Sequence, residues 1–289
     1  MLLDADSRVL VHGFGGVFAQ TQAAAMIAAG TRIVAGVSIG AGGRSILGVP
    51  TFDTVAEAVA ATGANTAAVY VPAAGARDAI VENADAGIRL AFVTAEHAPL
   101  HDTLFAVSYA RERGMWVIGP NSLGITVPGI GLLGSISLDL CRPGPVALIS
   151  RSGTLTLLTA RTLSAAGIGQ RVCVHVGGDQ ICGRNPTEYL DAFAADAEIR
   201  AVAYCGELGG GKEYALIERL AALGKPLVAM IVGRSAPPGK RMGHAGAIAG
   251  AQRETALAKR EALAVAGALI ADHPRQMAAQ LALVLAGRS

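Results

Sequence analysis

The stretch RVLVHGFGGVFAQTQAAAMIA, residues 8–28, joins a short apolar run to an alanine-rich segment through a glycine-rich turn. The apolar run at 8–12 has the length of a buried strand, and the segment at 18–28 has the length of a helix. A strand that enters a helix through a glycine turn is the opening unit of an α/β fold with a parallel sheet. This stretch therefore predicts the fold class, and the rest of the chain repeats its pattern.

The alternation continues on both sides of a break at residues 124–145. Before the break, further strands are expected at 31–37, 67–71, 90–94 and 116–118, with helices near 54–61, 75–86 and 100–113. Glycine and proline recur within 124–145, which predicts a hairpin-like linker. After it, strands are expected at 146–150, 171–176, 201–205, 226–232 and 268–270, and helices near 154–166, 186–195, 213–223, 253–266 and 274–286. The pattern predicts two open α/β domains, residues 1–123 and 146–289, with ligands beyond the carboxyl ends of their strands.

The composition excludes several classes of protein. Of the 289 residues, 52% are apolar and 16% are charged, which supplies sizeable cores and excludes intrinsic disorder. A net charge of +2 without a basic run, together with 4% aromatic residues, argues against nucleic-acid binding. No uncharged apolar run approaches the roughly 20 residues of a membrane span. The first residues lack the basic region of a secretory signal, and the four cysteines form no C-x-x-C pair, so we expect a cytoplasmic protein with reduced thiols and no membrane contact.

The loop after the first expected strand, HGFGGVF at residues 12–18, lies where a dinucleotide-binding fold places its phosphate loop. The full G-x-G-x-x-G pattern fails because Phe18 stands at its third glycine, and residues 34–38 lack the acidic residue that would bind a ribose. A redox role for NAD is therefore disfavoured. Gly15 and Gly16 still allow a phosphate to approach a helix N-terminus, although this loop alone is equally consistent with a tight turn that binds nothing.

A second strand-to-helix turn, SRSGT at residues 150–154, opens the second half of the chain. Its small hydroxyl residues suit the start of a helix, and the backbone N–H groups there would bind an anion. Simple capping of the helix is the alternative interpretation. The position of the turn, at the carboxyl edge of the second expected sheet, favours an anion site.

His244 has the most unusual setting of the six histidines, because Gly243 and Gly246 flank it in a long glycine- and proline-rich loop at 233–247. Loops of this length in a compact domain are usually functional or disordered. No second histidine or acidic residue stands at metal-ligand spacing, which disfavours a metal. An isolated loop histidine is most often simply solvated. A nucleophilic role would need a carboxylate on the other ring nitrogen, and Glu207, at the end of the neighbouring expected strand, could supply it.

Taken together, these motifs resemble those of the α subunit of succinyl-CoA synthetase and of related nucleoside-diphosphate-forming acyl-CoA synthetases. The most specific stretches are SRSGTL at 150–155, VGGD at 176–179, GELGG at 206–210 and APPGKRMGHAGAI at 236–248. The resemblance spans nearly the whole chain. It implies a Rossmann-like CoA-binding domain followed by a flavodoxin-like CoA-ligase domain. It also implies that His244 carries a phosphoryl group, that Glu207 orients this histidine, and that the helix start at Ser152, Gly153 and Thr154 receives the phosphate.

The resemblance implies the ligands and the partner as well. CoA is then a substrate, and the positions that correspond to a CoA site are Gly15, Gly16, Val17, Phe18, Val37, Ser38, Ala41, Tyr70, Pro72, Thr94, Ala95, Glu96 and Asn121. A small carboxylic acid is the other substrate, with Leu157 at the substrate-binding position. No nucleotide motif is visible in this chain, so a separate ATP-grasp β subunit would bind ATP or GTP and Mg, in an αβ or α2β2 assembly.

Several positions depart from the family pattern. Ala41 stands where a lysine approaches CoA, Leu157 replaces a tyrosine associated with the acid, and the loop at 13–20 loses side-chain hydroxyls. Because His244 and Glu207 are kept, we expect a paralogue that acts on an acid other than succinate. The alternatives are a CoA-binding regulatory protein that has lost catalysis, and an acyltransferase or lyase component that works without phosphohistidine.

Overall fold

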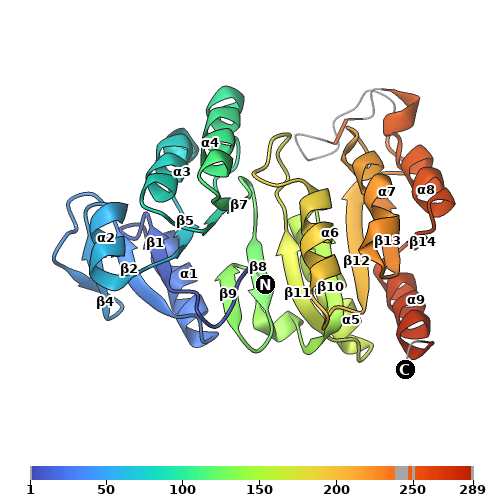
Figure 1. Ribbon diagram of the computed structural model, residues 1–289, viewed down its shortest axis with the longest axis horizontal. Helices are drawn as coiled ribbons and strands as arrows, with labels where there is room; N and C mark the ends of the chain where they lie inside the picture. The colour runs from blue at the N-terminus through green and yellow to red at the C-terminus, as the bar shows by residue number, and fades with distance from the viewer. Residues whose placement is uncertain (1, 238–246, 249–250, 288–289) are drawn as a thin grey trace. The chain divides into compact units, whose positions relative to one another are not determined.

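The computed structural model describes residues 2–237, 247–248 and 251–287, which form two compact units. The N-terminal unit comprises Leu2–Leu138 together with a later segment, Ile181–Arg184. The C-terminal unit comprises Asp139–Gln180 and the chain from Asn185 onward. Each unit is built on a mostly parallel sheet with helices, which confirms the predicted α/β fold class (Figure 1).

The N-terminal sheet has the strand order β3-β4-β2-β1-β5-β6-β7, and all of its neighbouring pairs except β3–β4 are parallel. Its strands are β1 (Val9–His12), β2 (Ile33–Val37), β3 (Ser45–Ile46), β4 (Val49–Phe52), β5 (Thr66–Val69), β6 (Leu90–Val93) and β7 (Trp116–Ile118). Its helices are α1 (Val17–Ala28), α2 (Val55–Thr62), α3 (Ala76–Asp85) and α4 (Leu100–Glu112). The apolar residues of β1, Val9, Leu10 and Val11, are completely buried, as expected for a central parallel strand.

The C-terminal unit contains parallel strands in the order β14-β13-β12-β10-β11. These strands are β10 (Pro143–Ser150), β11 (Gln170–His175), β12 (Ala201–Glu207), β13 (Leu227–Val232) and β14 (Leu269–Ile270). The helices between and after them are α5 (Gly153–Ala165), α6 (Pro186–Ala195), α7 (Lys212–Leu223), α8 (Ala256–Val265) and α9 (Pro274–Ala286). Helices α5 and α9 contact each other, and α7 contacts both α6 and α8, so the two groups cover opposite faces in the manner of a flavodoxin-like fold.

Two strands, β3 and β4, lie outside the elements expected from the sequence. The short β4 contains Pro50, which cannot donate to a ladder, and proline argues against a strand assignment from sequence alone. β4 nevertheless pairs with β2 on one side and with β3 on the other. Residues 124–134 form an antiparallel hairpin of β8 (Gly124–Val127) and β9 (Gly131–Gly134). This hairpin packs on α1, because the Gly134 N–H donates to the Met26 Sδ at 3.5 Å.

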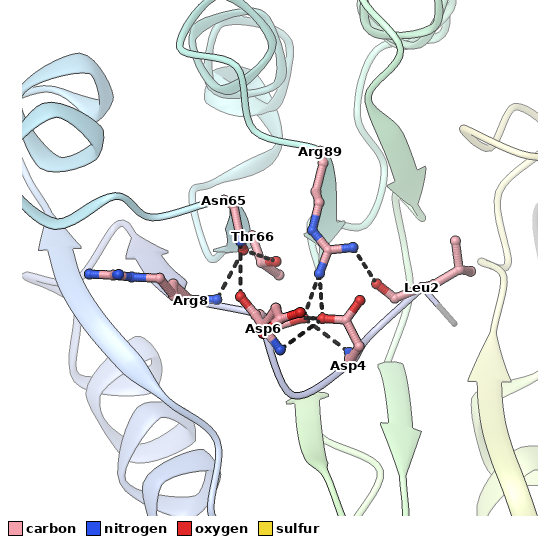
Figure 2. A network of polar contacts seen from close by, with 8 residues as sticks. Leu2, Asp4, Asp6, Arg8, Asn65, Thr66 and Arg89 are labelled. Carbon is pink, nitrogen blue, oxygen red and sulfur yellow. Dashed lines mark hydrogen bonds and ion pairs between the residues drawn. The ribbon is translucent and has the colours of Figure 1, made fainter.

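The chain before β1 is tied to the amino edge of the N-terminal sheet by a polar network (Figure 2). Arg89, directly before β6, donates from Nη2 to the Asp4 Oδ1 at 2.7 Å. Asn65, directly before β5, accepts from the Arg8 N–H at 2.9 Å and donates from Nδ2 to the Asp6 carbonyl at 3.0 Å. These contacts hold the first residues at the edge opposite the carboxyl ends of the strands.

The later segment Ile181–Arg184 completes the N-terminal unit beside β7. The Gly183 N–H donates to the Gly119 carbonyl at 2.8 Å, and the Arg184 guanidinium lies 4.8 Å from the centroid of the Trp116 ring. A Cβ added at Gly183 would lie 2.4 Å from the Val117 Cβ, so the backbone approaches β7 as closely as glycine allows.

Candidate active site

The strand order of the C-terminal unit brings two of the predicted motifs together. β11 lies on one side of β10, whereas β12, β13 and β14 lie on the other, so the switch point of the sheet falls between β10 and β12. Ligands in open α/β sheets bind outside the carboxyl ends of the strands at this point. Residues 150–154 lead from the end of β10 into α5, and Glu207 is the last residue of β12. The two motifs are therefore neighbours at the switch point.

The turn after β10 forms a capped helix start. Ser152 is the N-cap of α5, and its Oγ accepts from the Leu155 N–H at 3.5 Å. Ser150 Oγ accepts from the Ser152 N–H at 3.1 Å and donates to the Ser152 carbonyl at 2.9 Å, which fixes the turn. Gly153 is half-exposed and Thr154 is exposed. The first turn of α5 carries no acidic residue, so the positive end of the helix dipole is available to an anion.

Glu207 ends β12 as a buried carboxylate paired with a buried arginine. The Arg151 Nη2 lies 3.2 Å from the Glu207 Oε1, and the two side chains are 3% and 4% exposed. The Arg151 Nη1 lies 3.5 Å from the Oε1 of Glu213, in the first turn of α7. Arg151 belongs to the SRSGT motif, but its partners come from β12 and α7, so the sequence prediction missed its role.

A buried lysine lies behind this pair. The Lys259 Nζ, on α8, donates to the Glu213 Oε2 at 2.5 Å, to the Glu207 carbonyl at 2.9 Å and to the Gly209 carbonyl at 2.5 Å. The Tyr204 hydroxyl donates to the Glu213 Oε1 at 3.0 Å. Burial lowers the pKa of Lys259, and Glu213 opposes this shift. These groups had no local sequence signal, because they come from separate elements.

Cys205, which lies close to this arrangement in the sequence, is a buried thiol. Burial raises the pKa of the Cys205 thiol, two residues before Glu207, to about 12, so this thiol stays protonated. All four cysteines lie in the described part of the chain and are free thiols, with the Cys141 Sγ 3.7 Å from the Cys173 Sγ.

Within the described residues, no group of three histidine, cysteine or acidic side chains could hold a metal ion. No helix in the described ranges is long and apolar enough to cross a membrane.

The carboxyl edge of the N-terminal sheet gathers the positions expected to bind CoA. β2 and β4 lie on one side of β1, and β5, β6 and β7 lie on the other, so β1 borders the switch point. The expected positions are Gly15, Gly16, Val17 and Phe18 after β1, Val37, Ser38 and Ala41 at and after the end of β2, Tyr70 and Pro72 after β5, Thr94, Ala95 and Glu96 after β6, and Asn121 after β7. Each of these loops follows the carboxyl end of its strand.

Close contacts join several of these loops. A Cβ added at Gly15 would lie 2.7 Å from the Ser38 Oγ. The rings of Phe18 and Tyr70 meet edge to face with centroids 5.7 Å apart. Residues 15–18 at the start of α1 are exposed, and none of them is a lysine or arginine. Phe18 contributes an aromatic ring to this helix start. Ala41 is only 8% exposed, so at this position the chain presents a small buried methyl group.

Two predicted site residues remain to be placed. Leu157 lies half-buried on α5, one turn after Thr154. His244 lies outside the described residues. Glu254, a described residue C-terminal to His244, contacts the loop that follows Glu207. Its carbonyl accepts from the Gly209 N–H at 2.8 Å.

Comparison with known proteins assigns both units. Residues 4–97 match the model of the CoA binding domain, and residues 149–269 match the CoA-ligase model. The chain is 41% identical to the α subunit of ADP-forming succinate–CoA ligase of Methanothermobacter thermautotrophicus, over 95% of this chain and 93% of the relative. It is 42% identical to α subunit 2 of the Archaeoglobus fulgidus enzyme, over 99% of both chains.

Among solved structures, ATP citrate lyase of Methanosaeta concilii matches with a TM-score of 0.90 and 26% identity. That match covers 100% of this chain and 51% of the other, so this chain spans about half the length of the lyase chain. The ADP-bound dinucleotide-forming acetyl-coenzyme A synthetase 1 of Ca. Korarchaeum cryptofilum has a TM-score of 0.75 at 21% identity and shows a shared fold.

These matches define the class of protein, a CoA-binding domain followed by a CoA-ligase domain. The chain belongs to the family of succinate–CoA ligase α subunits. The family resemblance and the fold predicted from the sequence are thereby confirmed.

Proposed function

We propose that this chain is the α subunit of an NDP-forming acyl-CoA synthetase, which joins CoA to a carboxylic acid. In this proposal, His244 accepts the γ-phosphoryl group of ATP or GTP and the nucleoside diphosphate leaves. The carboxylate of the acid then takes the phosphoryl group from the histidine to form an acyl phosphate. The thiolate of CoA attacks the acyl carbon, phosphate leaves, and the proton of the thiol passes to solvent.

The observation that carries the proposal is the Arg151–Glu207 pair beside the start of α5, at the switch point between β10 and β12. A carboxylate at this place can accept the N–H of an imidazole and hold the other nitrogen toward a phosphoryl group. The N-terminus of α5, capped by Ser152, offers the backbone N–H groups of Gly153 and Thr154 to the transferred phosphate. The ADP-forming relatives, at 41–42% identity, support the same chemistry.

The N-terminal unit supplies CoA in this scheme. Residues 4–97 match a CoA binding domain, and the exposed glycines Gly15 and Gly16 precede α1 at the carboxyl edge of the sheet. Phosphate groups of CoA would meet backbone N–H groups there. Ala41 offers no cation to them, so we expect weaker CoA binding than a lysine at this position would give.

The relatives are named α subunits, and we propose that a β subunit of the ATP-grasp type completes the enzyme. That partner would bind ATP or GTP and Mg, in an αβ or α2β2 assembly. The four free cysteines suit a reducing compartment such as the cytoplasm.

The acid substrate is proposed to be less polar than succinate. Leu157 lies one turn into α5, close in sequence to the proposed phosphate site, and offers an apolar surface where the family resemblance expects a tyrosine hydroxyl. A site built around a hydroxyl discriminates strongly, and its loss shifts preference toward apolar substrates. Ratios of kcat/KM for succinate, malate and longer or branched acids, measured on the complex and on Leu157→Tyr, test this. A wild-type preference for succinate over every other acid would contradict it.

A lyase component is a second candidate, favoured by the match of the whole chain to half of ATP citrate lyase. In that case, the assembled protein would cleave an acyl-CoA made in its own site rather than release it. Product analysis distinguishes the two: a stable acyl-CoA supports the synthetase, whereas carbon–carbon cleavage of the acyl group supports the lyase.

The central experiment uses the chain co-expressed with its candidate β subunit. Incubation with γ-labelled ATP or GTP should place an acid-labile, base-stable label on this chain, and His244→Ala should abolish it. His101→Ala, which changes an exposed histidine on α4, is the matched control and should label normally. Labelling that survives His244→Ala would overturn the assignment. Nucleotide-dependent ligase activity of the rigorously purified single chain would overturn the need for a partner.

A further inference from the structure

Four charged side chains form a buried cluster beneath the carboxyl edge of the C-terminal sheet. This buried charge cluster consists of Arg151, Glu207, Glu213 and Lys259, each with a side chain no more than 4% exposed. Its two cations and two carboxylates balance each other. The four residues come from the turn after β10, the end of β12, and helices α7 and α8. One cluster therefore joins four separate elements and includes Glu207, a residue of the proposed active site.

Glu207 is held by this cluster at two points. Its carboxylate is paired with the Arg151 Nη2 at 3.2 Å, and its main-chain carbonyl accepts from the Lys259 Nζ at 2.9 Å. The Arg151 N–H also donates to the Cys205 carbonyl at 3.0 Å, so the arginine backbone is fixed to the same strand. Both the side chain and the backbone of Glu207 are thus set by charged groups outside its own element.

Lys259 connects helix α8 to α7 and to the chain at the end of β12. An ammonium has three N–H donors, and those of Lys259 go to the carbonyls of Glu207 and Gly209 and to the Glu213 Oε2. Gly209 has a φ of 89°, a left-handed backbone that glycine adopts without strain. The lysine therefore fixes the path of the chain that leaves Glu207, from the helix behind it.

The cost of such a cluster argues for a role beyond stability. Charges removed from water lose hydration that their mutual attraction repays only with good geometry, and apolar residues often stabilise a fold as well. Burial lowers the pKa of Lys259, which reflects this cost at the lysine itself. Within the cluster the Glu213 carboxylate contacts both Arg151 and Lys259, and both of these cations also contact Glu207, the residue to which the proposed function gives a task. The Arg171–Asp196 contact of the same unit lies elsewhere, at the start of β11.

We propose that Lys259, acting with Glu213 and Arg151, is a positioning residue that sets the Glu207 carboxylate for phosphoryl transfer. The inference rests on the proposed function. Lys259 does not touch a substrate in this scheme. It determines where the end of β12 lies, while Glu213 couples the lysine to the arginine that pairs with the Glu207 carboxylate.

The test is a double-mutant cycle on the rate of labelling of the assembled complex by γ-labelled nucleotide in a single turnover. Lys259→Met should slow labelling about tenfold or more, with the nucleotide concentration for half-maximal rate unchanged. On a Glu207→Gln background, Lys259→Met should slow it less than about threefold further, because the lysine acts through that carboxylate. Lys259→Arg should recover part of the rate. Arg171→Met, which breaks the ion pairs with Asp196 and Glu198 in the same unit away from Glu207, should label as wild type does.

A charge-balanced variant covers the case in which Lys259→Met does not fold. Glu213→Gln with Lys259→Met removes one charge of each sign and leaves Arg151 with Glu207. This variant should fold and still label slowly. Wild-type labelling rates in it, or full additivity of Lys259→Met with Glu207→Gln, would overturn the positioning role. Absence of any label on the wild-type complex would overturn the proposed function instead, so the two failures are distinguishable.

Discussion

The starts of α1 and α5 share one geometry and differ in chemistry. Each follows a strand that borders the switch point of its sheet, β1 in the N-terminal unit and β10 in the C-terminal unit. Gly16 caps α1 without a side chain, and the residues around it are exposed. Ser152 caps α5 with its hydroxyl, and the buried Arg151 lies directly before it.

Under the proposed function, this difference separates the site that binds CoA from the site that transfers a phosphoryl group. At α1, the helix start consists of bare backbone and the exposed ring of Phe18, which packs edge to face on the buried ring of Tyr70, and neither ring carries a charge. At α5, the helix start is backed by the buried charge cluster, whose geometry is fixed by four elements. A site that holds a ligand needs access, whereas a site that moves a phosphoryl group needs groups held in place.

The largest expected effect comes from removing a cation from the buried charge cluster beside the start of α5. Arg151→Met leaves two buried carboxylates without their shared cation and should destabilise the C-terminal unit by about 3–5 kcal/mol. The matched change at α1 is Gln20→Ala, which removes a contact of 3.2 Å from Gln20 Nε2 to the Phe14 carbonyl. Gln20→Ala should change the free energy of unfolding of the N-terminal unit by no more than about 0.5 kcal/mol. Hydrogen exchange read separately for β10 and β1 measures both, and equal losses would contradict the contrast.

The close packing of Gly36, on β2, against the Phe14 ring gives the next largest effect. A Cβ at Gly36 would lie 1.9 Å from the Cδ1 of Phe14, which is completely buried, so Gly36→Ala should cost about 1–3 kcal/mol in the N-terminal unit. The loss should appear in β1 and β2 and should be absent from β10. Phe14→Leu in the same chain makes room for the methyl group, so the double variant should lose less than the sum of the single losses. Full additivity would show that the ring is not the obstacle.

Exchanging the caps should change stability by less. Ser152→Ala removes the acceptor for the Leu155 N–H and should cost about 1 kcal/mol. Gly16→Ser adds a possible cap to α1, where a Cβ meets nothing closer than 3.5 Å, and should gain a few tenths of a kcal/mol. Chemical denaturation followed by unit-specific exchange gives both values. A stabilising Ser152→Ala would mean that the hydroxyl is strained there rather than capping.

The smallest effect is a pH dependence confined to the N-terminal unit. Burial lowers the pKa of His12, at the end of β1, and Glu82 opposes the shift. Below about pH 6.5 the unfolded chain binds a proton at this residue that the folded chain takes up only at lower pH. The free energy of unfolding should therefore fall as the pH drops through this range.

The check is His12→Gln, which should remove this part of the pH dependence while keeping a group that can contact Asn83. Exchange of β1, corrected for the intrinsic pH dependence of amide exchange, should flatten, and β10 should be unaffected. An unchanged profile would assign the pH dependence to another group.

The sequence predicted the fold well because each strand and helix carries its own pattern. The central strands of both sheets and the helices between them lie within a few residues of the expected ranges. The short strand β4 escaped because Pro50 breaks its pattern, and its pairing depends on its neighbours β2 and β3. The prediction also placed Glu207 and Ser152 at one sheet edge, where the structure has them.

The buried charge cluster could not be predicted in the same way. Glu213 and Lys259 lie on helices α7 and α8, and each looks locally like any helical charged residue. Their burial depends on how the helices pack on the sheet, which no local pattern records. The assignment of His244 remains a prediction, because this residue lies outside the described ranges.

The segment Ile181–Arg184 has a consequence for synthesis of the protein. The N-terminal unit is not complete when Leu138 leaves the ribosome, because Gly183 and Arg184 have still to reach β7. Until then, the edge at Trp116 and Val117 lacks its cover. During translation, the N-terminal unit can therefore be completed only after residues 181–184 have been synthesised. A gene fragment that ends at Leu138 would encode an N-terminal unit that lacks this segment.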